Sequence, residues 1–287
     1  MQTFQRILFP TDMSDSATAA APFVEALARK FQAEVTLLHV LEMPPGYVTD
    51  WYGYMALVDT NAIRDARRGE FDTYLAGKFD GLTVRREMLE GDPAQSICAY
   101  ATEHGADLIM MPTHGYGVFR AMLLGSVTAK VLHDAACPVW TGVHVEETPA
   151  TATNLQRIMC AVDLTEKSIP TMQFASKLAH GYHAKLWLIH AVPGAETRPQ
   201  KYFEADLQTF LEDEARKAIG KMQETAGVVA PLCLGAGEVS NVVHEAALHH
   251  AADLVVIGRG HSTRTLGRLR TNVYSIIRQA PCPVVSV

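Results

Sequence analysis

The two halves of this 287-residue chain carry the same series of short motifs in the same order. The matching segments are RILFPTD (6–12) with RIMCAVD (157–163), AEVTLLH (33–39) with AKLWLIH (184–190), ADLIMM (106–111) with ADLVVI (252–257), and CPV (137–139) with CPV (282–284). The separation between partners falls only from 151 to 145 residues along the chain, so the second copy is six residues shorter. This series indicates a duplicated domain. The polar, Thr-rich stretch 144–154 contains one proline and predicts a linker, which places the domains at residues 1–145 and 154–287.

Within each copy, short apolar segments alternate with longer segments of helical periodicity. In the first copy the apolar segments predict five strands, at residues 7–11, 35–40, 84–89, 108–113 and 139–143. Helical spacing predicts three one-sided apolar faces, made by Phe23, Leu27 and Phe31, by Phe71, Leu75 and Phe79, and by Val127 and Val131. Strands that are apolar throughout are typical of parallel sheets buried on both faces. The expected fold is therefore a doubly wound α/β sandwich with an open parallel five-stranded sheet, flavodoxin-like in its three layers and present twice.

One helix has clear boundary signals. Asp92 followed by Pro93 predicts an N-cap with proline in the first helical position, and Gly105 is placed to end the same helix.

Composition narrows the class of protein. Hydrophobic residues make up 48% of the chain, which is enough for ordinary packed cores. The net charge of −6 argues against nucleic-acid binding through a strong positive field. No apolar run approaches the roughly 18 residues that span a bilayer, and the N-terminus lacks the features of a signal peptide. The five cysteines form no Cys-x-x-Cys pair and suit a reducing compartment, so we expect a soluble cytoplasmic protein.

Small and polar residues follow the strands at the places where open α/β sheets bind ligands, beyond the carboxyl ends. The first strand runs into Thr11 and Asp12, the fourth into residues 111–115 (MPTHG), and Gly125-Ser126 precedes the last helix of the first copy. Glycine lets a ligand approach the backbone, and Ser126 with the first helical amides suits a phosphate. These residues predict a nucleotide pocket. Taken alone, Gly125-Ser126 also suits a helix cap, and Asp12 a turn or an N-cap.

The spacing of these residues resembles that of the universal stress protein family in its tandem form. Nucleotide-binding members of that family carry Gly-x-x-Gly, nine residues, then Gly-Ser or Gly-Thr. This chain has PTHG at 112–115, nine residues, and Gly125-Ser126. The resemblance spans both repeats, through Gly91 and the ADL and CPV motifs as well. It implies an adenine nucleotide alpha hydrolase-like fold and ATP, with Mg²⁺, as the ligand of the N-terminal repeat.

The resemblance also implies which residues hold the nucleotide. Thr11 and Asp12 would contact the adenosine, and the backbone of Val40 would face the adenine. The residues implied to wrap the ribose and phosphates are Met111, Pro112, Thr113, His114 and Gly115. Those implied to hold phosphate oxygens are Gly125, Ser126, Val127 and Thr128. Pro112 stands where the family's motif begins with glycine, and proline lacks an N–H and fixes φ.

The second repeat departs from this pattern. It reads GRGH at 258–261, and Arg270 falls on the position of Gly125. A guanidinium cannot share the space that a phosphate needs against bare backbone. We therefore predict that this repeat does not bind ATP in the family's way and fills its own pocket with Arg270 or His261, although Asp163 is retained.

Metal and enzyme interpretations have little support in the residues. None of the 12 histidines has the spacing and acidic partner of a zinc enzyme, and the repeated His39 and His190 lie inside strands, where packing is the simpler role. The dinucleotide, P-loop and nucleophile-elbow motifs do not occur. His114 is the one general base near the implied phosphates, so a slow ATPase stays open as a third hypothesis.

The leading hypothesis is a stress-response regulator or signalling module that binds ATP in the first repeat. The family's dimers pair their last strands, and the resemblance implies an internal pseudo-dimer in which residues 139–142 pair antiparallel with 284–286; a homodimer is also open. A nucleotide-free scaffold is the alternative, kept open by Pro112. It would bind an unknown protein partner through residues 43–57, an aromatic and Met-containing segment that suits a lid over the pocket equally well.

Overall fold

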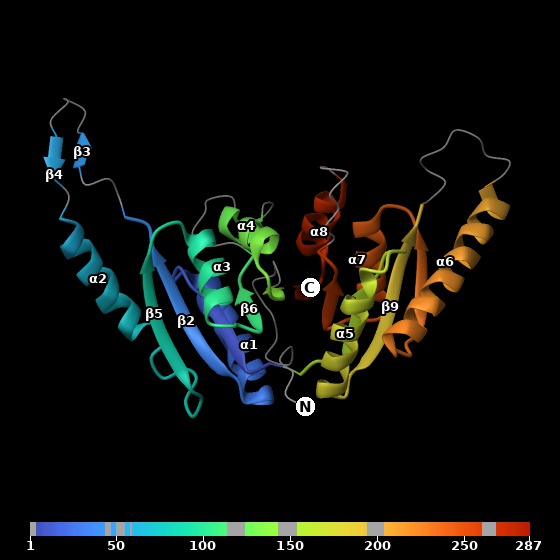
Figure 1. Cartoon of the computed structure of the whole chain (residues 1–287), viewed down its shortest axis with the longest axis horizontal. Helices are drawn as coiled ribbons and strands as arrows, with labels where there is room; N and C mark the ends of the chain where they lie inside the picture. The colour runs from blue at the N-terminus through green and yellow to red at the C-terminus, as the bar shows by residue number, and fades with distance from the viewer. Residues whose placement is uncertain are drawn as a thin grey trace. The chain divides into compact units, whose positions relative to one another are not determined.

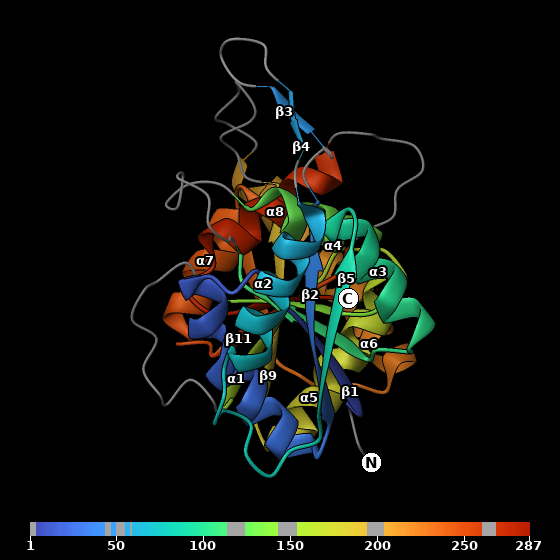
Figure 2. The same ribbon diagram turned by 90° about the vertical axis from the view of Figure 1, so that its left-hand side faces the viewer.

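Alternating strands and helices build the same layered sheet in each repeat. The computed structural model describes residues 4–43, 47–49, 55–57, 59–113, 124–142, 154–193, 204–259 and 268–287. By its internal contacts the chain divides into two units, one made mainly of residues 2–137 and the other mainly of residues 138–287. Each unit is a mostly parallel sheet with helices on both faces, which confirms the doubly wound α/β class (Figures 1 and 2).

The N-terminal unit has four parallel strands in the order β6-β1-β2-β5. They are β1 (Arg6–Pro10), β2 (Glu34–Leu41), β5 (Val84–Glu90) and β6 (Leu108–Met111). The helices are α1 (Asp15–Phe31) and α2 (Thr60–Thr73) on one face, and α3 (Pro93–Glu103) and α4 (Ser126–Asp134) on the other. Figure 2 shows α2 and α3 on opposite sides of β2 and β5. Between β2 and α2, the strands β3 (Tyr47–Thr49) and β4 (Met55–Leu57) pair as an antiparallel ribbon.

The C-terminal unit repeats this topology. Its parallel strands follow the order β10-β9-β8-β11-β12. They are β8 (Arg157–Ala161), β9 (Lys185–Val192), β10 (Leu232–Ala236), β11 (Leu254–Ile257) and β12 (Val284–Ser286). The helices are α5 (Ser168–Tyr182), α6 (Glu204–Ala226), α7 (Val239–His249) and α8 (Arg268–Gln279). None of the helices in the described part of the chain combines the length and apolar character needed to cross a bilayer.

The last strand of the first repeat, β7 (Val139–Thr141), groups with the C-terminal unit. It pairs antiparallel with β12, with Thr141 opposite Val284 and Val139 opposite Ser286. The Thr141 hydroxyl also donates to the Val284 carbonyl at 3.2 Å. The antiparallel pairing of these two segments is therefore confirmed, and it covers what would otherwise be an open sheet edge at β12.

The predicted boundaries of α3 are confirmed by its caps. Asp92 is the N-cap and its Oδ1 accepts a hydrogen bond from the Gln95 amide at 2.9 Å, with Pro93 as the first helical residue. Gly105 follows the helix with φ of +60°, a conformation that glycine adopts without a steric cost.

The prediction that Phe71, Leu75 and Phe79 form one helical face was wrong, because only Phe71 lies in a helix. Helix α2 ends at Thr73, and Leu75 and Phe79 have φ of 55° and 63° in the turns that follow. The Arg86 guanidinium ends the helix, because it donates to the carbonyls of Phe71 at 2.8 Å and of Tyr74 at 2.7 Å. Phe71 and Phe79 are both buried, so the apolar spacing reflects burial of a turn rather than a continuous helix.

The repeated Ala-Asp-Leu motif joins the starts of two neighbouring strands. One Asp107 carboxylate oxygen accepts from the amides of Gln5 at 2.7 Å and Arg6 at 2.9 Å. Asp253 accepts from the Gln156 and Arg157 amides, both at 2.8 Å. These carboxylates lie at the amino ends of the strands, opposite the edge where ligands bind, so this motif is structural.

Candidate functional site

Three strand ends and one helix start meet at the carboxyl edge of the N-terminal sheet. Pro10 of β1 lies opposite Leu38 of β2, and Leu8 lies opposite Ile109 of β6, so the three strands end at the same edge. The residues predicted at this edge and described by the structure are Thr11 and Asp12 after β1, Val40 in β2, and Met111, Pro112 and Thr113 at the end of β6. Their convergence is what the sequence predicts. His114 and Gly115 lie outside the described residues.

The turn from β1 to α1 is held by its own polar side chains. The Met13 amide donates to Thr11 Oγ1 at 2.9 Å, and the Ser14 amide donates to Asp12 Oδ1 at 3.0 Å. Ser14, not Asp12, is the N-cap, because its hydroxyl accepts from the Ala17 amide at 3.2 Å. Met13 has φ of 64°, an unusual conformation for a residue with a side chain. Within the described chain, the second oxygen of Asp12 accepts no such bond and suits a ribose hydroxyl.

The start of α4 is joined to the end of β6. The Gly125 amide donates to the Thr113 carbonyl at 2.8 Å, and the Thr128 hydroxyl donates to the Pro112 carbonyl at 3.1 Å. Gly125 is the N-cap and provides no side-chain hydrogen bond to the helix. Among the described residues no side chain caps the first amides of α4, at Ser126 and Val127, so their N–H groups are available to an anion at the positive end of the helix dipole.

The side chains around this helix start have different roles. Ser126 is exposed, whereas Thr128 is only 3% exposed and its hydroxyl is already committed to Pro112. Thr128 therefore joins α4 to the end of β6 through its side chain, and its backbone amide is the group left for a phosphate. Lys130, further along the same helix, pairs with Asp92 at 3.3 Å across to α3.

His39 belongs to this site although the sequence suggested only packing. Its Nδ1 lies 2.8 Å from the Thr11 carbonyl, and the side chain is 6% exposed. Burial lowers the pKa of His39 below its ordinary value of 6.5, against a raising effect of the bond to Thr11. The same contact occurs in the second copy, where His190 Nδ1 lies 2.8 Å from the Val162 carbonyl, so the repeated histidine is a sequence signal for the contact but not for a role at the site.

A lowered pKa of His39 links stability to pH. In the window below pH 6.5 the unfolded chain binds more protons at this residue than the folded chain, so the free energy of unfolding falls as the pH drops. We expect His39→Asn, which does not titrate, to show a smaller loss of stability between about pH 7.5 and about pH 5.5 than the unsubstituted protein. Urea denaturation at both pH values measures this, and equal losses would contradict it.

The second repeat uses its matching aspartate differently. Asp163 Oδ1 accepts from the Thr165 amide at 3.0 Å, the Thr165 hydroxyl at 2.6 Å and the Ser168 hydroxyl at 2.8 Å. Helix α5 begins five residues after Asp163, whereas α1 begins three residues after Asp12. Val162 replaces Thr11 and brings no hydroxyl. The turn after β8 is therefore built differently from the turn after β1, with three bonds on one oxygen of Asp163 and no hydroxyl at position 162.

The prediction that Arg270 or His261 fills the second pocket is not tested by these contacts. Arg270 lies in the first turn of α8, but its side chain is outside the described part, as is the whole of His261. Within the described residues, no three His, Cys, Asp or Glu side chains are grouped as a metal site would require.

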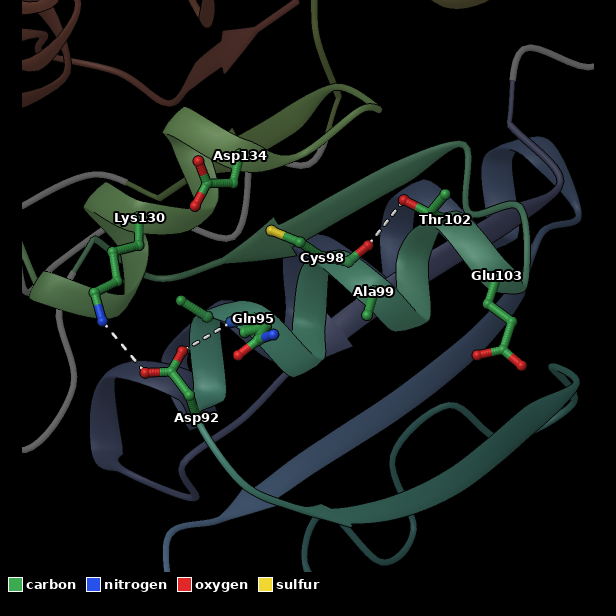
Figure 3. Close-up of a pocket in the computed structure, with 9 residues that line it drawn as sticks. Asp92, Gln95, Cys98, Ala99, Thr102, Glu103, Lys130 and Asp134 are labelled. Atoms are coloured by element: carbon green, nitrogen blue, oxygen red, sulfur yellow. Dashed lines mark hydrogen bonds and ion pairs between the residues drawn. The ribbon is translucent and has the colours of Figure 1, made fainter.

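An open groove of about 830 Å³ lies between α3 and α4, away from the predicted nucleotide residues. Figure 3 shows Asp92 at the start of α3 reaching Lys130 of α4, with Cys98 and Asp134 also lining the groove. Its charges are mixed and partly paired, and the helix start that it contains, that of α3, is already capped by the Asp92 carboxylate.

Comparisons with known proteins agree with the repeat and the fold. The model of the universal stress protein family matches residues 3–141 and again residues 154–287. Universal stress protein MJ0531 of Methanocaldococcus jannaschii is 32% identical over 136 residues, which cover 47% of this chain and 80% of that protein. A universal stress protein of Thermus aquaticus is 35% identical over 140 residues, covering 47% of this chain and 96% of the relative.

Solved structures match over both repeats at once. A universal stress protein from Archaeoglobus fulgidus has a TM-score of 0.70 at 20% identity, covering 99% of this chain and 96% of that one. A protein of unknown function from Pseudomonas aeruginosa has a TM-score of 0.65 at 18% identity, covering 100% and 93%. At these identities the likeness concerns the fold. The double match to the family model covers nearly the whole chain, and the chain therefore belongs to the universal stress protein family.

Proposed function

We propose that the N-terminal repeat binds ATP, with Mg²⁺, at the carboxyl edge of its sheet. The observation that carries this proposal is the start of α4, where Gly125 leaves the first amides without a side-chain partner. The bond from Gly125 to Thr113 holds that helix start at the end of β6, on the edge where Asp12 follows β1. A phosphate chain suits the helix start, and a ribose suits the Asp12 carboxylate.

In this proposal the second repeat carries no nucleotide. Asp163 is bonded by Thr165 and Ser168, and Arg270 stands at the position of Gly125. One repeat thus binds a ligand while the other supports it as the second half of an internal pseudo-dimer. The pairing of β7 with β12 supports that arrangement. A protein whose two halves differ in this way suits a regulator that reports nucleotide level rather than an enzyme.

The cytoplasm is the proposed location. None of the five cysteines, all of them in the described part of the chain, forms a disulfide, and burial raises the pKa of the Cys160 and Cys282 thiols to about 12. Buried thiols of this kind are inert packing groups. Cysteines without disulfides are typical of a reducing compartment.

A nucleotide-free scaffold is the second candidate, and the β3-β4 ribbon is compatible with it. A two-stranded ribbon is only marginally stable alone in water, so a ribbon between β2 and α2 calls for something to pack against, either the nucleotide or a protein partner. Pro112 favours the same candidate, since it removes an amide donor from the loop that the family uses.

Calorimetric titration of nucleotide-stripped protein with ATP and Mg²⁺ separates these candidates. We expect a stoichiometry near one ATP per chain. Two sites per chain would overturn the assignment of the second repeat as empty. No binding would overturn the proposed function and leave the scaffold as the better account.

A further inference from the structure

His39 holds the peptide group that leads into the nucleotide site. A carbonyl oxygen can only accept, so the short Nδ1 contact to Thr11 places the ring hydrogen on Nδ1. The Thr11 peptide is also bonded through its amide, which donates to the Leu38 carbonyl at 2.9 Å. Both backbone polar groups of Thr11 are thus fixed by two consecutive residues of β2.

The environment of the ring keeps this hydrogen in place. His39 Nε2 is buried and has no hydrogen-bond partner among the described residues. The His39 ring packs against the ring of Phe71 of α2, with the two centroids 5.7 Å apart. The guanidinium carbon of Arg86 of β5 lies over the Phe71 ring, 5.7 Å from its centroid. The charged groups that act on His39 are Arg67 and Glu70 of α2 and Asp12 after β1. Moving the hydrogen to Nε2 would leave the Thr11 carbonyl without its donor and place an N–H where none of the described residues accepts it.

The position of Thr11 decides that of Asp12. The Thr11 hydroxyl accepts from the Met13 amide, and the Asp12 carboxylate accepts from the Ser14 amide. A shift of Thr11 is therefore passed on to the whole turn through these hydrogen bonds. Met13 is in the left-handed conformation, and these bonds help to hold it there. Loss of the His39 bond therefore loosens the turn that presents the Asp12 carboxylate.

We propose that His39 is a positioning residue of the nucleotide site, acting through Thr11 on Asp12 without touching the ligand. This inference rests on the proposed function. The second repeat has the same bond, from His190 to Val162, next to a turn that we assign no ligand. The bond therefore supports the fold in both repeats, and in the first repeat it also sets the geometry for the nucleotide.

The two repeats give a matched experiment in one protein. His39→Asn keeps an amide donor near the Nδ1 position, whereas His39→Gln carries its amide toward the Nε2 position and His39→Leu has none. His190→Leu removes the same bond from the second repeat and is the control. We expect His39→Leu and His39→Gln to weaken ATP affinity about tenfold, because the net loss of one buried hydrogen bond is of this size. His39→Asn should stay within about threefold of the unsubstituted protein, and His190→Leu should leave affinity unchanged.

The readouts distinguish this proposal from the function on which it rests. Absence of ATP binding in the unsubstituted protein is a failure of the proposed function. Binding that is unchanged in His39→Gln, or equally weakened in His190→Leu, contradicts the positioning role while the function stands. Amide hydrogen exchange adds a second test, since His39→Gln should speed exchange at Met13 and Ser14. If His39→Leu does not fold, the comparison of Asn with Gln still decides which ring nitrogen matters.

Discussion

Gly125→Arg should lower ATP affinity by at least about a hundredfold, enough to remove the calorimetric signal at ordinary concentrations. The substitution places a side chain at the N-cap of α4, where the phosphates would contact the amides of Ser126 and Val127. A guanidinium could pair with a phosphate at a distance, but it cannot share the space against the backbone. The matched control is Gly69→Arg on α2 of the same repeat, where a Cβ would meet nothing within 4 Å.

Undiminished binding in Gly125→Arg would show that the nucleotide lies elsewhere in the chain. The reverse substitution, Arg270→Gly, should leave the stoichiometry at one. Removing the side chain at position 270 does not free Asp163 from Thr165 and Ser168, nor restore the hydroxyl that Val162 lacks. A second site in Arg270→Gly would mean that this arginine alone keeps the second repeat empty.

Gly235→Ala should lower the free energy of unfolding by about 2–3 kcal/mol. Gly235 lies in β10 directly beneath α7, and a Cβ there would lie 2.5 Å from Val242 Cγ1 and 3.3 Å from Cγ2. Val242 is buried, so the helix must move or the valine must leave its rotamer. Denaturant unfolding followed by circular dichroism measures the loss.

Two further variants show whether crowding is the cause. Gly220→Ala in α6 has open space around its Cβ and should stabilise the protein by roughly 0.5–1 kcal/mol through helix propensity. In the double variant Gly235→Ala with Val242→Ala, the two effects should not add, since the smaller side chain makes room for the new methyl. Strict additivity would rule out the steric explanation.

Sequence periodicity predicted the strands well and one helix poorly. Fully apolar strands such as β6 are identified by their own side chains, so their positions follow from local sequence. The end of α2 depends on Arg86, which is distant in sequence and reaches the Phe71 and Tyr74 carbonyls only after β5 has joined the sheet. A helical spacing of Phe71, Leu75 and Phe79 therefore could not reveal the turn between them.

The candidate site was predictable in its parts but not in its connections. The order of Thr11, Asp12 and Gly125 along the chain, together with the family resemblance, indicated where a nucleotide would bind. The roles of His39 in β2 and Thr128 in α4 depend on contacts with residues distant in sequence, since one binds the Thr11 carbonyl and the other the Pro112 carbonyl. Neither hydrogen bond can be predicted from the local sequence. The only hint is that the histidine of the first bond recurs as His190 in the second repeat.

The pairing of β7 with β12 has a consequence for biosynthesis. Thr141 bonds to a residue 143 positions further along the chain. At about 5–20 residues per second, a ribosome makes β7 roughly 7–30 seconds before the strand that covers it. During that time Val139, Trp140 and Thr141, all buried in the finished protein, present an apolar strand edge that invites pairing with other chains. Because β12 is made late, we expect chaperone protection of the nascent first repeat to raise the yield.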